Sequence, residues 1–225
     1  MTALFVTSTG TDIGKTFVTR GTIRQLLARG RTVEVLKPVI TGFDPRSAHQ
    51  SDTGRLLSAL GRPLTPVHIG AMSPYRFATP VSPDLAARLE GTVIDFAALT
   101  TFCREVIGRH EDALMIEGVG GIMVPLDGHH TVLDWMIEID LPLLLVVGSY
   151  VGTLSHTLTA LDVIDRHELK VAAVVVSETP GSAASLNDTA ATIRRFAPDV
   201  TVFALPRLPE MLTDHPAMAA IADLM

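Results

Sequence analysis

Six short apolar runs, which are rich in β-branched residues and alternate with helical patterns, constrain the fold of this chain more than any other feature. The runs span Ala3–Thr7, Val33–Lys37, Ala113–Glu117, Pro142–Gly148, Val171–Ser177 and Val200–Leu205. Apolar residues recur at three- and four-residue spacing in Lys15–Arg29, Asp95–Arg109, Leu154–His167 and Ser182–Phe196. Continuous apolar runs indicate strands buried on both faces, and the spacing indicates crossover helices. The alternation predicts an α/β fold with a doubly wound, mostly parallel sheet and helices on both faces.

The size and apolar content of the chain favour one compact domain. Its 225 residues, of which 47% are hydrophobic, can bury a sizeable core and lie within the single-domain range. Six prolines and scattered glycines fall within Phe43–Pro83, which we expect to form a loop-rich excursion at one end of the sheet. We therefore predict a single domain over residues 1–225.

Charge, cysteine content and hydropathy exclude several classes of function. The net charge of −6, without a Lys or Arg cluster, argues against a nucleic-acid partner. Cys103 is the only cysteine, so no intrachain disulfide can form, and we expect a buried, unreactive thiol. The N-terminus lacks a basic n-region, and no apolar run reaches about 18 residues, so neither a signal peptide nor a membrane span is predicted. We expect a cytoplasmic protein with no membrane partner.

The first strand runs directly into a phosphate-binding loop. Residues Ser8–Thr16 have the sequence Ser-Thr-Gly-Thr-Asp-Ile-Gly-Lys-Thr, and a helical pattern follows at once. Gly14 lets the backbone close around a phosphate, Lys15 can reach the β- and γ-phosphates, and the Thr16 hydroxyl can bind Mg²⁺. The loop predicts a nucleoside triphosphate and Mg²⁺ in a P-loop NTPase-like fold.

The match to the P-loop pattern is imperfect. Thr9 holds the position of the first glycine, with Ser8 before it and Gly10 after it. The alternative is an ordinary strand-to-helix turn, but such a turn does not explain why Lys15 and Thr16 open a helix directly after the first strand. Nucleotide binding is the favoured interpretation.

Two charged residues end apolar strands elsewhere in the chain. Glu117 is followed by a glycine-rich segment, residues 118–121, and a strand-terminal acid in a P-loop fold commonly holds Mg²⁺. A solvated glutamate beside a turn is the alternative. Lys37 ends the second strand, where a lysine is unusual, and an exposed strand-end lysine is the alternative there. Both residues are candidates for a site at the carboxyl edge of the sheet.

Two further polar residues have local interpretations. Asp52 precedes a helical pattern, and its position alone favours a helix N-cap. His156 lies at the start of a helix, and no second histidine or acid accompanies it at the spacing of metal ligands. We expect His156 to make a local hydrogen bond.

Four ordered segments together resemble the dethiobiotin synthetase family: Ser8–Thr16, Leu36–Gly42, Met115–Leu126 and Leu141–Leu158. The resemblance covers nearly the whole chain. It implies an ATP-dependent cyclo-ligase of biotin biosynthesis that joins 7,8-diaminononanoate and CO₂. One amine attacks CO₂, the resulting carbamate takes the γ-phosphoryl group of ATP, and the second amine closes the ureido ring.

The resemblance also implies the site residues. Mg²⁺ ligands match Thr16, Asp52 and Glu117, so Asp52 becomes a metal ligand instead of a helix cap. Nucleotide-binding positions match Thr9, Gly10, Asp12, Ile13, Gly14, Lys15, Thr16, Ser177, Pro206 and Leu208. Substrate-binding positions match Thr11, Lys37, Thr41, Gly118, Gly152 and Thr153. Catalytic roles are implied for Lys37, Lys15 and Thr11; the two lysines would neutralise charge on phosphate and carbamate, as preorganised cations do in phosphoryl transfer.

A homodimer is implied as well. Gly152 and Thr153 match a helix start whose backbone amides hold the substrate carboxylate across the dimer interface, and a helix N-terminus is a suitable anion site. A symmetric dimer with substrate between its subunits is the expected state.

The chain departs from the family pattern at three points, one of which is Asp84, in place of a residue that is often basic or neutral near the substrate loop. Ser8 stands where glycine is usual, which narrows the backbone freedom of the loop. Ser177 and Glu178 stand where well-known members have Asn and Asp reading adenine, and one hydroxyl cannot make the paired contact of an amide. We expect looser base selectivity, unless main-chain groups from Pro206 to Glu210 supply the contact.

Two other functions remain as alternatives. One is a related P-loop amide-forming synthetase with another substrate, although the glutamine amidotransferase domain that usually accompanies it is missing here. The other is a ParA- or MinD-like regulatory ATPase switch. Those proteins carry an additional lysine early in the phosphate loop, where this chain has Ser8, Thr9 and Gly10.

Overall fold

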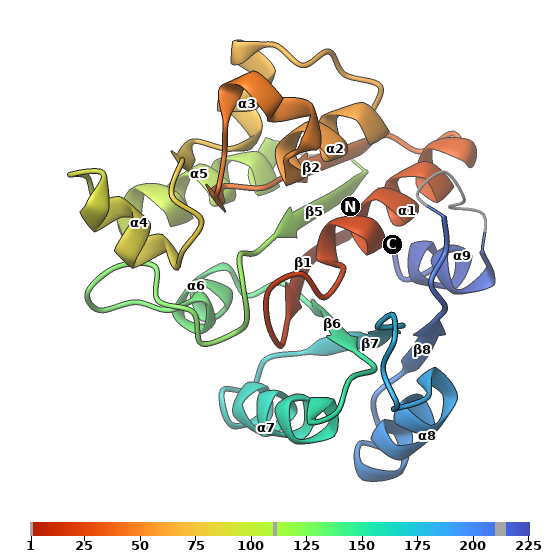
Figure 1. Ribbon diagram of the computed structural model, residues 1–225. Helices are drawn as coiled ribbons and strands as arrows, with labels where there is room; N and C mark the ends of the chain where they lie inside the picture. Colours follow the sequence, from red (N-terminus) through yellow and green to blue (C-terminus); the bar gives the residue numbers. More distant parts are fainter. Residues whose placement is uncertain (1, 110–111, 210–214) are drawn as a thin grey trace.

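The central element of the fold is one parallel sheet (Figure 1), seen in a computed structural model that describes residues 2–109, 112–209 and 215–225. Its strand order is β2-β5-β1-β6-β7-β8, and every pair of neighbours is parallel. The strands are β1 Thr2–Ser8, β2 Val33–Leu36, β5 Ala113–Glu117, β6 Leu143–Gly148, β7 Val171–Ser177 and β8 Val202–Leu205. The predicted doubly wound parallel sheet is confirmed.

Helices cover both faces of this sheet (Figure 1). One face carries α1 Lys15–Ala28, α2 Asp52–Ala59 and α9 Pro216–Ala222. The other carries α5 Phe96–Arg109, α6 Val132–Ile139, α7 Thr153–Arg166 and α8 Leu186–Phe196. In β1, Leu4 and Val6 pack on the first face and Ala3 and Phe5 on the second, because side chains alternate along a strand. Burial on both faces explains the continuous apolar runs.

The segment Phe43–Pro83 is more regular than we predicted. It contains the 3₁₀ helix η1 Pro45–Gln50, α2, α3 Pro66–Met72 and β4 Tyr75–Phe77, and α4 Pro83–Leu89 starts at its end. Strand β4 pairs in parallel with β3 Val39–Thr41 as a separate two-stranded sheet. The loop prediction was wrong because several prolines open helices, where their fixed φ and missing N–H cost nothing, instead of interrupting them. The segment packs on the main body through contacts between α2 and α1.

Helix ends follow local capping chemistry that hydrophobic periodicity does not reveal. Helix α8 starts at Leu186 and not at Ser182, because the Ser185 hydroxyl caps it by accepting from the Asp188 N–H at 3.0 Å. Helix α6 was not predicted, although Thr131 and Asp134 form a capping box that the sequence already contains. The helices were predictable in kind, and the caps set their boundaries.

Two expectations from composition can be compared with the fold. Cys103 is fully buried, as expected, and burial raises the pKa of its thiol to about 12. Among the described residues, no helix combines the length and the apolar content needed to cross a membrane.

Candidate active site

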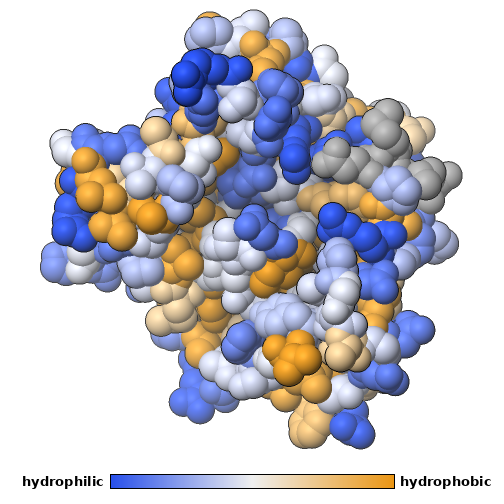
Figure 2. All heavy atoms as spheres, in the orientation of Figure 1, coloured by the Kyte–Doolittle hydropathy of each residue, from blue (hydrophilic) through white to orange (hydrophobic). Residues whose placement is uncertain are grey.

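A polar cavity of about 330 Å³ opens at the carboxyl edge of the sheet, between the phosphate loop, α2 and the loop after β8. The space-filling view shows hydrophilic residues in a hollow on this face (Figure 2). The lining includes five cationic residues and two acidic ones: Lys15, Arg20, Lys37, Arg55 and Arg207, against Asp12 and Asp52. In a chain of net charge −6, this local excess of cations favours an anionic ligand.

The phosphate loop has the backbone that its sequence predicts. Gly14 caps α1 in a left-handed conformation with φ of 113°, and a side chain there would also approach the Ser177 hydroxyl. Lys15 and Thr16 are the first residues of α1, so its free N–H groups and the positive end of its dipole point at the loop. Gly14 is therefore required by conformation, and the loop forms an anion cradle.

The Lys15 ammonium group is held by oxygen atoms of two loops. It donates to the Ser8 hydroxyl at 2.9 Å and to the carbonyls of Gly10 and Gly120 at 3.1 and 2.9 Å. Burial, followed by repulsion from Lys37, lowers the pKa of Lys15 to about 8. The negative charge of a phosphate group would stabilise the charged form of this buried ammonium.

Ser8 has a specific role that the sequence did not reveal. It is the last residue of β1, where it pairs with Val146 in the sheet, so no glycine conformation is needed there. Its buried hydroxyl contacts Lys15 and also donates to the Gly120 carbonyl at 2.9 Å. The reduced backbone freedom expected at Ser8 therefore causes no strain, because serine adopts a strand conformation readily.

Glu117 and Lys37 form a buried ion pair at the floor of the cavity. The Lys37 ammonium is 2.9 Å from the Glu117 carboxylate and donates to the Gly118 carbonyl at 2.7 Å. Glu117 is fully buried and accepts from the hydroxyls of Thr16 and Thr19, both at 2.7 Å. The alternatives of a solvated glutamate and an exposed lysine are therefore wrong.

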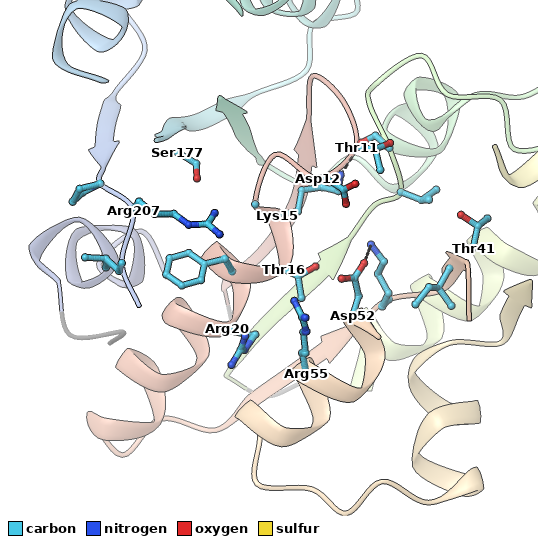
Figure 3. A pocket seen from close by; sticks show the side chains of 18 residues that line it. Thr11, Asp12, Lys15, Thr16, Arg20, Thr41, Asp52, Arg55, Ser177 and Arg207 are labelled. Atoms are coloured by element: carbon cyan, nitrogen blue, oxygen red, sulfur yellow. Dashed lines mark hydrogen bonds and ion pairs between the residues drawn. The ribbon is translucent and has the colours of Figure 1, made fainter. Parts of the chain in front are cut away.

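Asp52 completes this group. Ser51 is the N-cap of α2, and its hydroxyl accepts from the Gly54 N–H at 3.1 Å, so the cap interpretation of Asp52 is wrong. The Asp52 carboxylate lies 3.3 Å from the Lys37 ammonium. Burial alone would raise the pKa of Asp52, but Lys37 and the Thr16 hydroxyl outweigh it and lower the pKa. Asp52 is an ionised acid facing the cavity (Figure 3).

The three residues expected to bind Mg²⁺ lie together. The carboxylates of Asp52 and Glu117 contact the Lys37 ammonium, and the Thr16 hydroxyl donates to Glu117. Hydroxyl and carboxylate oxygens are ligands that Mg²⁺ prefers. The described part of the chain holds no cluster of three or more His, Cys, Asp or Glu side chains able to bind a metal.

The two threonines expected near the substrate lie at the cavity as well. Thr11, in the phosphate loop, and Thr41, at the end of β3, both line it (Figure 3). Gly118 follows Glu117, and its carbonyl accepts from Lys37. A side chain at Gly118 would touch the Phe5 ring at 3.0 Å, so the close packing there needs glycine.

Gly152 and Thr153 lie at a separate place, the start of α7. Gly152 is the left-handed N-cap of this helix, which confirms the predicted helix start. The Thr153 hydroxyl donates to the Gly148 carbonyl at 2.7 Å, and its amide donates to the Tyr150 carbonyl at 3.0 Å. Both groups of Thr153 are thus engaged within the chain. Neither Gly152 nor Thr153 lines the cavity.

An apolar groove of about 470 Å³, which the sequence did not lead us to expect, lies between the phosphate loop and α7. Its lining comprises Thr9, Gly10, Thr11, Gly121, Ile122, Met123, Val124, His156, Thr159, Ala160 and Val163. The α7 residues recur at three- and four-residue spacing, a signal that could have identified this face. His156 makes the expected local hydrogen bond, to the Tyr150 hydroxyl at 2.9 Å. Thr11 lines both the groove and the cavity, so the two are adjacent.

One end of the cavity is formed by the last residue of β7 and the loop after β8. Ser177, Pro206 and Leu208 line it as expected, and Glu210 lies outside the described residues. Three arginines in the lining were not predicted: Arg20, Arg55 and Arg207. Arg20 lies one turn after Thr16 on the same face of α1, and the four-residue spacing could have revealed it. Arg207 lies in a loop, where no periodic signal marks it.

The parallel sheet, the phosphate loop at the start of α1 and the lysine–acid cluster define a P-loop nucleoside triphosphate-binding protein. The family described as an AAA domain matches residues 2–213. The ATP-dependent dethiobiotin synthetase BioD of Caulobacter vibrioides is 45% identical over 92% of this chain and 93% of its own length. Its counterpart of the same name from Methylobacterium nodulans is 46% identical over 88% of this chain and 90% of its own. The chain belongs to the dethiobiotin synthetase family.

A solved structure supports the fold alone. The MinC:MinD cell division protein complex of Aquifex aeolicus is similar, with a TM-score of 0.60 over 100% of this chain and 93% of that one. The identity is only 14%, so this likeness carries no function across.

Proposed function

We propose that this chain forms dethiobiotin from 7,8-diaminononanoate, CO₂ and ATP, releasing ADP and phosphate. Membership of the dethiobiotin synthetase family supports this activity. The observation that carries the proposal is the buried Lys37 ammonium between Glu117 and Asp52, directly beside the phosphate loop. A fixed cation at that point can stabilise the negative charge of both a carbamate and a transferring phosphoryl group.

The proposed steps assign each residue a task that suits its chemistry. Thr11 and Thr41 face the diamine, one of whose amines attacks CO₂ and loses a proton to give the carbamate. Lys37 neutralises the negative charge of the carbamate. A carbamate oxygen attacks the γ-phosphorus of ATP and ADP leaves, while Lys15 neutralises the charge of the phosphates. The second amine then attacks the carbamate carbon, phosphate leaves, and the ring closes. Mg²⁺, held by Thr16, Asp52 and Glu117, would screen the charge of the ATP phosphates.

The apolar groove suits the carbon chain of the substrate. It is adjacent to the cavity at Thr11, so a diamine at the cavity could place its apolar chain along Ile122 and Val124. The far end of such a chain would approach the start of α7. We propose that the carboxylate meets Gly152 and the helix N-terminus there, through amides other than that of Thr153.

We further propose a homodimer of single-domain subunits that acts in the cytoplasm. Val151 and Met123, at the start of α7 and beside the groove, are 80% and 55% exposed. Large exposed apolar side chains beside a ligand groove favour a protein interface, and the family resemblance implies a dimer. The proposed requirement for ATP supports a location in the cytoplasm. Light scattering of the purified chain, with and without substrate, tests the dimer.

Turnover with single omissions tests the activity. ADP release would be followed with MgATP, diaminononanoate and bicarbonate, and then with each omitted. We expect release to require all three and dethiobiotin to accumulate one for one with ADP. ADP release at the same rate with and without diaminononanoate would indicate a regulatory ATPase. ADP release that requires a different carboxylated substrate would indicate a related synthetase.

A base-selectivity prediction follows from Ser177, which lines the cavity with a single hydroxyl. Losing one paired amide contact should reduce discrimination between ATP and other triphosphates by about 1 to 3 kcal/mol. We expect activity with CTP or GTP, at less than about a thousandfold loss in kcat/KM. Ser177→Asn should sharpen the preference for ATP. If the wild type rejects other triphosphates as strongly as Ser177→Asn does, the base is read elsewhere.

A further inference from the structure

Thr19 contacts the acid at the floor of the cavity, although it belongs neither to the phosphate-loop pattern nor to the cavity lining. It lies on α1 one turn after Thr16 and is fully buried. Its hydroxyl is 2.7 Å from Oε2 of Glu117. Thr16 and Lys37 both donate to the other oxygen, Oε1, at 2.7 and 2.9 Å. The two oxygens of the Glu117 carboxylate are thus held by different groups.

The proton of the Thr19 hydroxyl goes to Glu117. The hydroxyl is also 3.0 Å from the Lys15 carbonyl, and its single proton can serve only one of the two acceptors. The Lys15 carbonyl stands four residues before Thr19 on α1, where an α-helix already supplies a backbone N–H. Glu117 is paired with Lys37 as a carboxylate, and hydrogen bonds to a charged acceptor are shorter and stronger. Thr19 is therefore the donor that holds Oε2.

The donors around Glu117 leave little of its carboxylate unoccupied. A carboxylate offers roughly four acceptor positions, two on each oxygen. Within the described part of the chain, Lys37 and Thr16 take both positions on Oε1, and Thr19 takes one on Oε2. The remaining position on Oε2 can serve a metal ion or a water molecule bound to it. The torsion that turns a carboxylate has a broad minimum, so a donor on Oε2 is needed to fix its direction.

We propose that Thr19 is a positioning residue, whose hydroxyl holds the Glu117 carboxylate in the orientation that binds Mg²⁺. This inference rests on the proposed function, in which Glu117 takes part in Mg²⁺ binding. Hydrogen-bond partners that orient a metal ligand typically contribute about tenfold to a hundredfold in metal affinity. Thr19 acts through Glu117 alone, because its own hydroxyl has given its proton to that carboxylate and does not line the cavity.

Thr22 provides a matched control one turn further along α1. It is also a fully buried threonine, and its hydroxyl donates to the Val18 carbonyl at 3.0 Å, four residues earlier. Among the described side chains, it has no acidic partner. Thr22→Val therefore makes the same chemical change in the same helix without touching Glu117.

Equilibrium binding of ADP over a series of Mg²⁺ concentrations tests this role without turnover. Thr19→Val keeps the shape of the side chain and removes the hydroxyl. We expect the Mg²⁺ concentration that gives half of the full gain in ADP affinity to rise about tenfold in this variant. The Kd for ADP without Mg²⁺ should be unchanged. Thr19→Ser, which keeps a hydroxyl, should restore the wild-type Mg²⁺ response, and Thr22→Val should match the wild type throughout.

Steady-state kinetics separate positioning from a general loss of structure. In Thr19→Val, the Mg²⁺ concentration needed for half-maximal turnover should rise about tenfold, whereas kcat at saturating Mg²⁺ should fall less than about threefold. A merely structural role would lower kcat at every Mg²⁺ concentration, together with the urea midpoint. Thr19→Ser and Thr19→Ala differ by one hydroxyl, so they give the same comparison if Thr19→Val does not fold.

Three results would overturn the proposal. An unchanged Mg²⁺ response in Thr19→Val would show that Glu117 is held without Thr19. An equal shift in Thr22→Val would assign the effect to the packing of α1. A weaker Kd for ADP without Mg²⁺ would assign it to the phosphate loop. In each case a wild type that forms dethiobiotin with Mg²⁺ would leave the proposed function intact, whereas a wild type whose ADP binding and turnover do not depend on Mg²⁺ would remove both the metal site and this role of Thr19.

Discussion

Lys15→Ala is expected to lower kcat/KM for ATP by about a hundredfold to a thousandfold, because it removes the ammonium group that would neutralise the β- and γ-phosphates. The structure shows which contacts the protein itself would lose. Gly10 and Gly120 lose a donor to their carbonyls, and Ser8 loses one to its hydroxyl. The Ser8 hydroxyl stays 2.6 and 2.9 Å from these two carbonyls, and a buried acceptor that does lose its donor costs about 1 to 3 kcal/mol, so the variant should still fold.

The measurement pairs steady-state kinetics with thermal unfolding in the presence and absence of MgATP. Ligand binding to the native state stabilises it, so the stabilisation by ATP should shrink together with turnover. Lys170→Ala is the matched control, because Lys170 is an exposed lysine that follows α7 and lines neither the cavity nor the groove. Normal kcat/KM in Lys15→Ala would remove the phosphate-loop assignment.

The sequence was most informative where a local pattern decides the structure. The phosphate loop depends on neighbouring residues alone: Gly14 needs its left-handed conformation, and Lys15 opens the helix that follows. Buried parallel strands similarly leave continuous apolar runs that a single sequence displays. These features were sufficient to predict both the fold and the position of the nucleotide site.

The sequence was least informative where a contact joins distant segments. Glu117 and Lys37 are 80 positions apart, and only the pairing of β2 with β5 brings the ends of their strands together. Their burial could not be deduced, because a charged residue at a strand end is compatible with solvent exposure until its partner is known. The position of Asp52 alone favoured the cap for the same reason: a cap is a local pattern, whereas the contact of Asp52 with Lys37 is not, and only the family resemblance implied a metal ligand there. Arg207 gave no signal because its backbone contact is with Glu178, 29 positions earlier.

Glu117→Gln is expected to raise the Mg²⁺ concentration needed for half-maximal activity by about tenfold or more and to lower kcat by about a hundredfold. It should also destabilise the fold, because Glu117 is fully buried and paired with Lys37. Breaking one side of a buried ion pair typically costs about 3 to 5 kcal/mol. Activity at varied Mg²⁺ and urea unfolding measure the two effects.

Because a destabilised variant can lose activity for trivial reasons, Asp52→Asn provides the sharper form of this prediction. The Asp52 side chain is 39% exposed, so its replacement should cost little stability while still raising the Mg²⁺ requirement strongly. Ser51→Ala, one residue earlier, is the matched control: it removes the true cap of α2 and should cost about 1 kcal/mol with normal Mg²⁺ dependence. The two variants should therefore behave in opposite ways. Ser51→Ala should lower the stability of the fold and leave the Mg²⁺ requirement unchanged, whereas Asp52→Asn should raise the Mg²⁺ requirement and cost little stability. If Asp52→Asn instead lost stability and kept a normal Mg²⁺ response, Asp52 would not bind the metal.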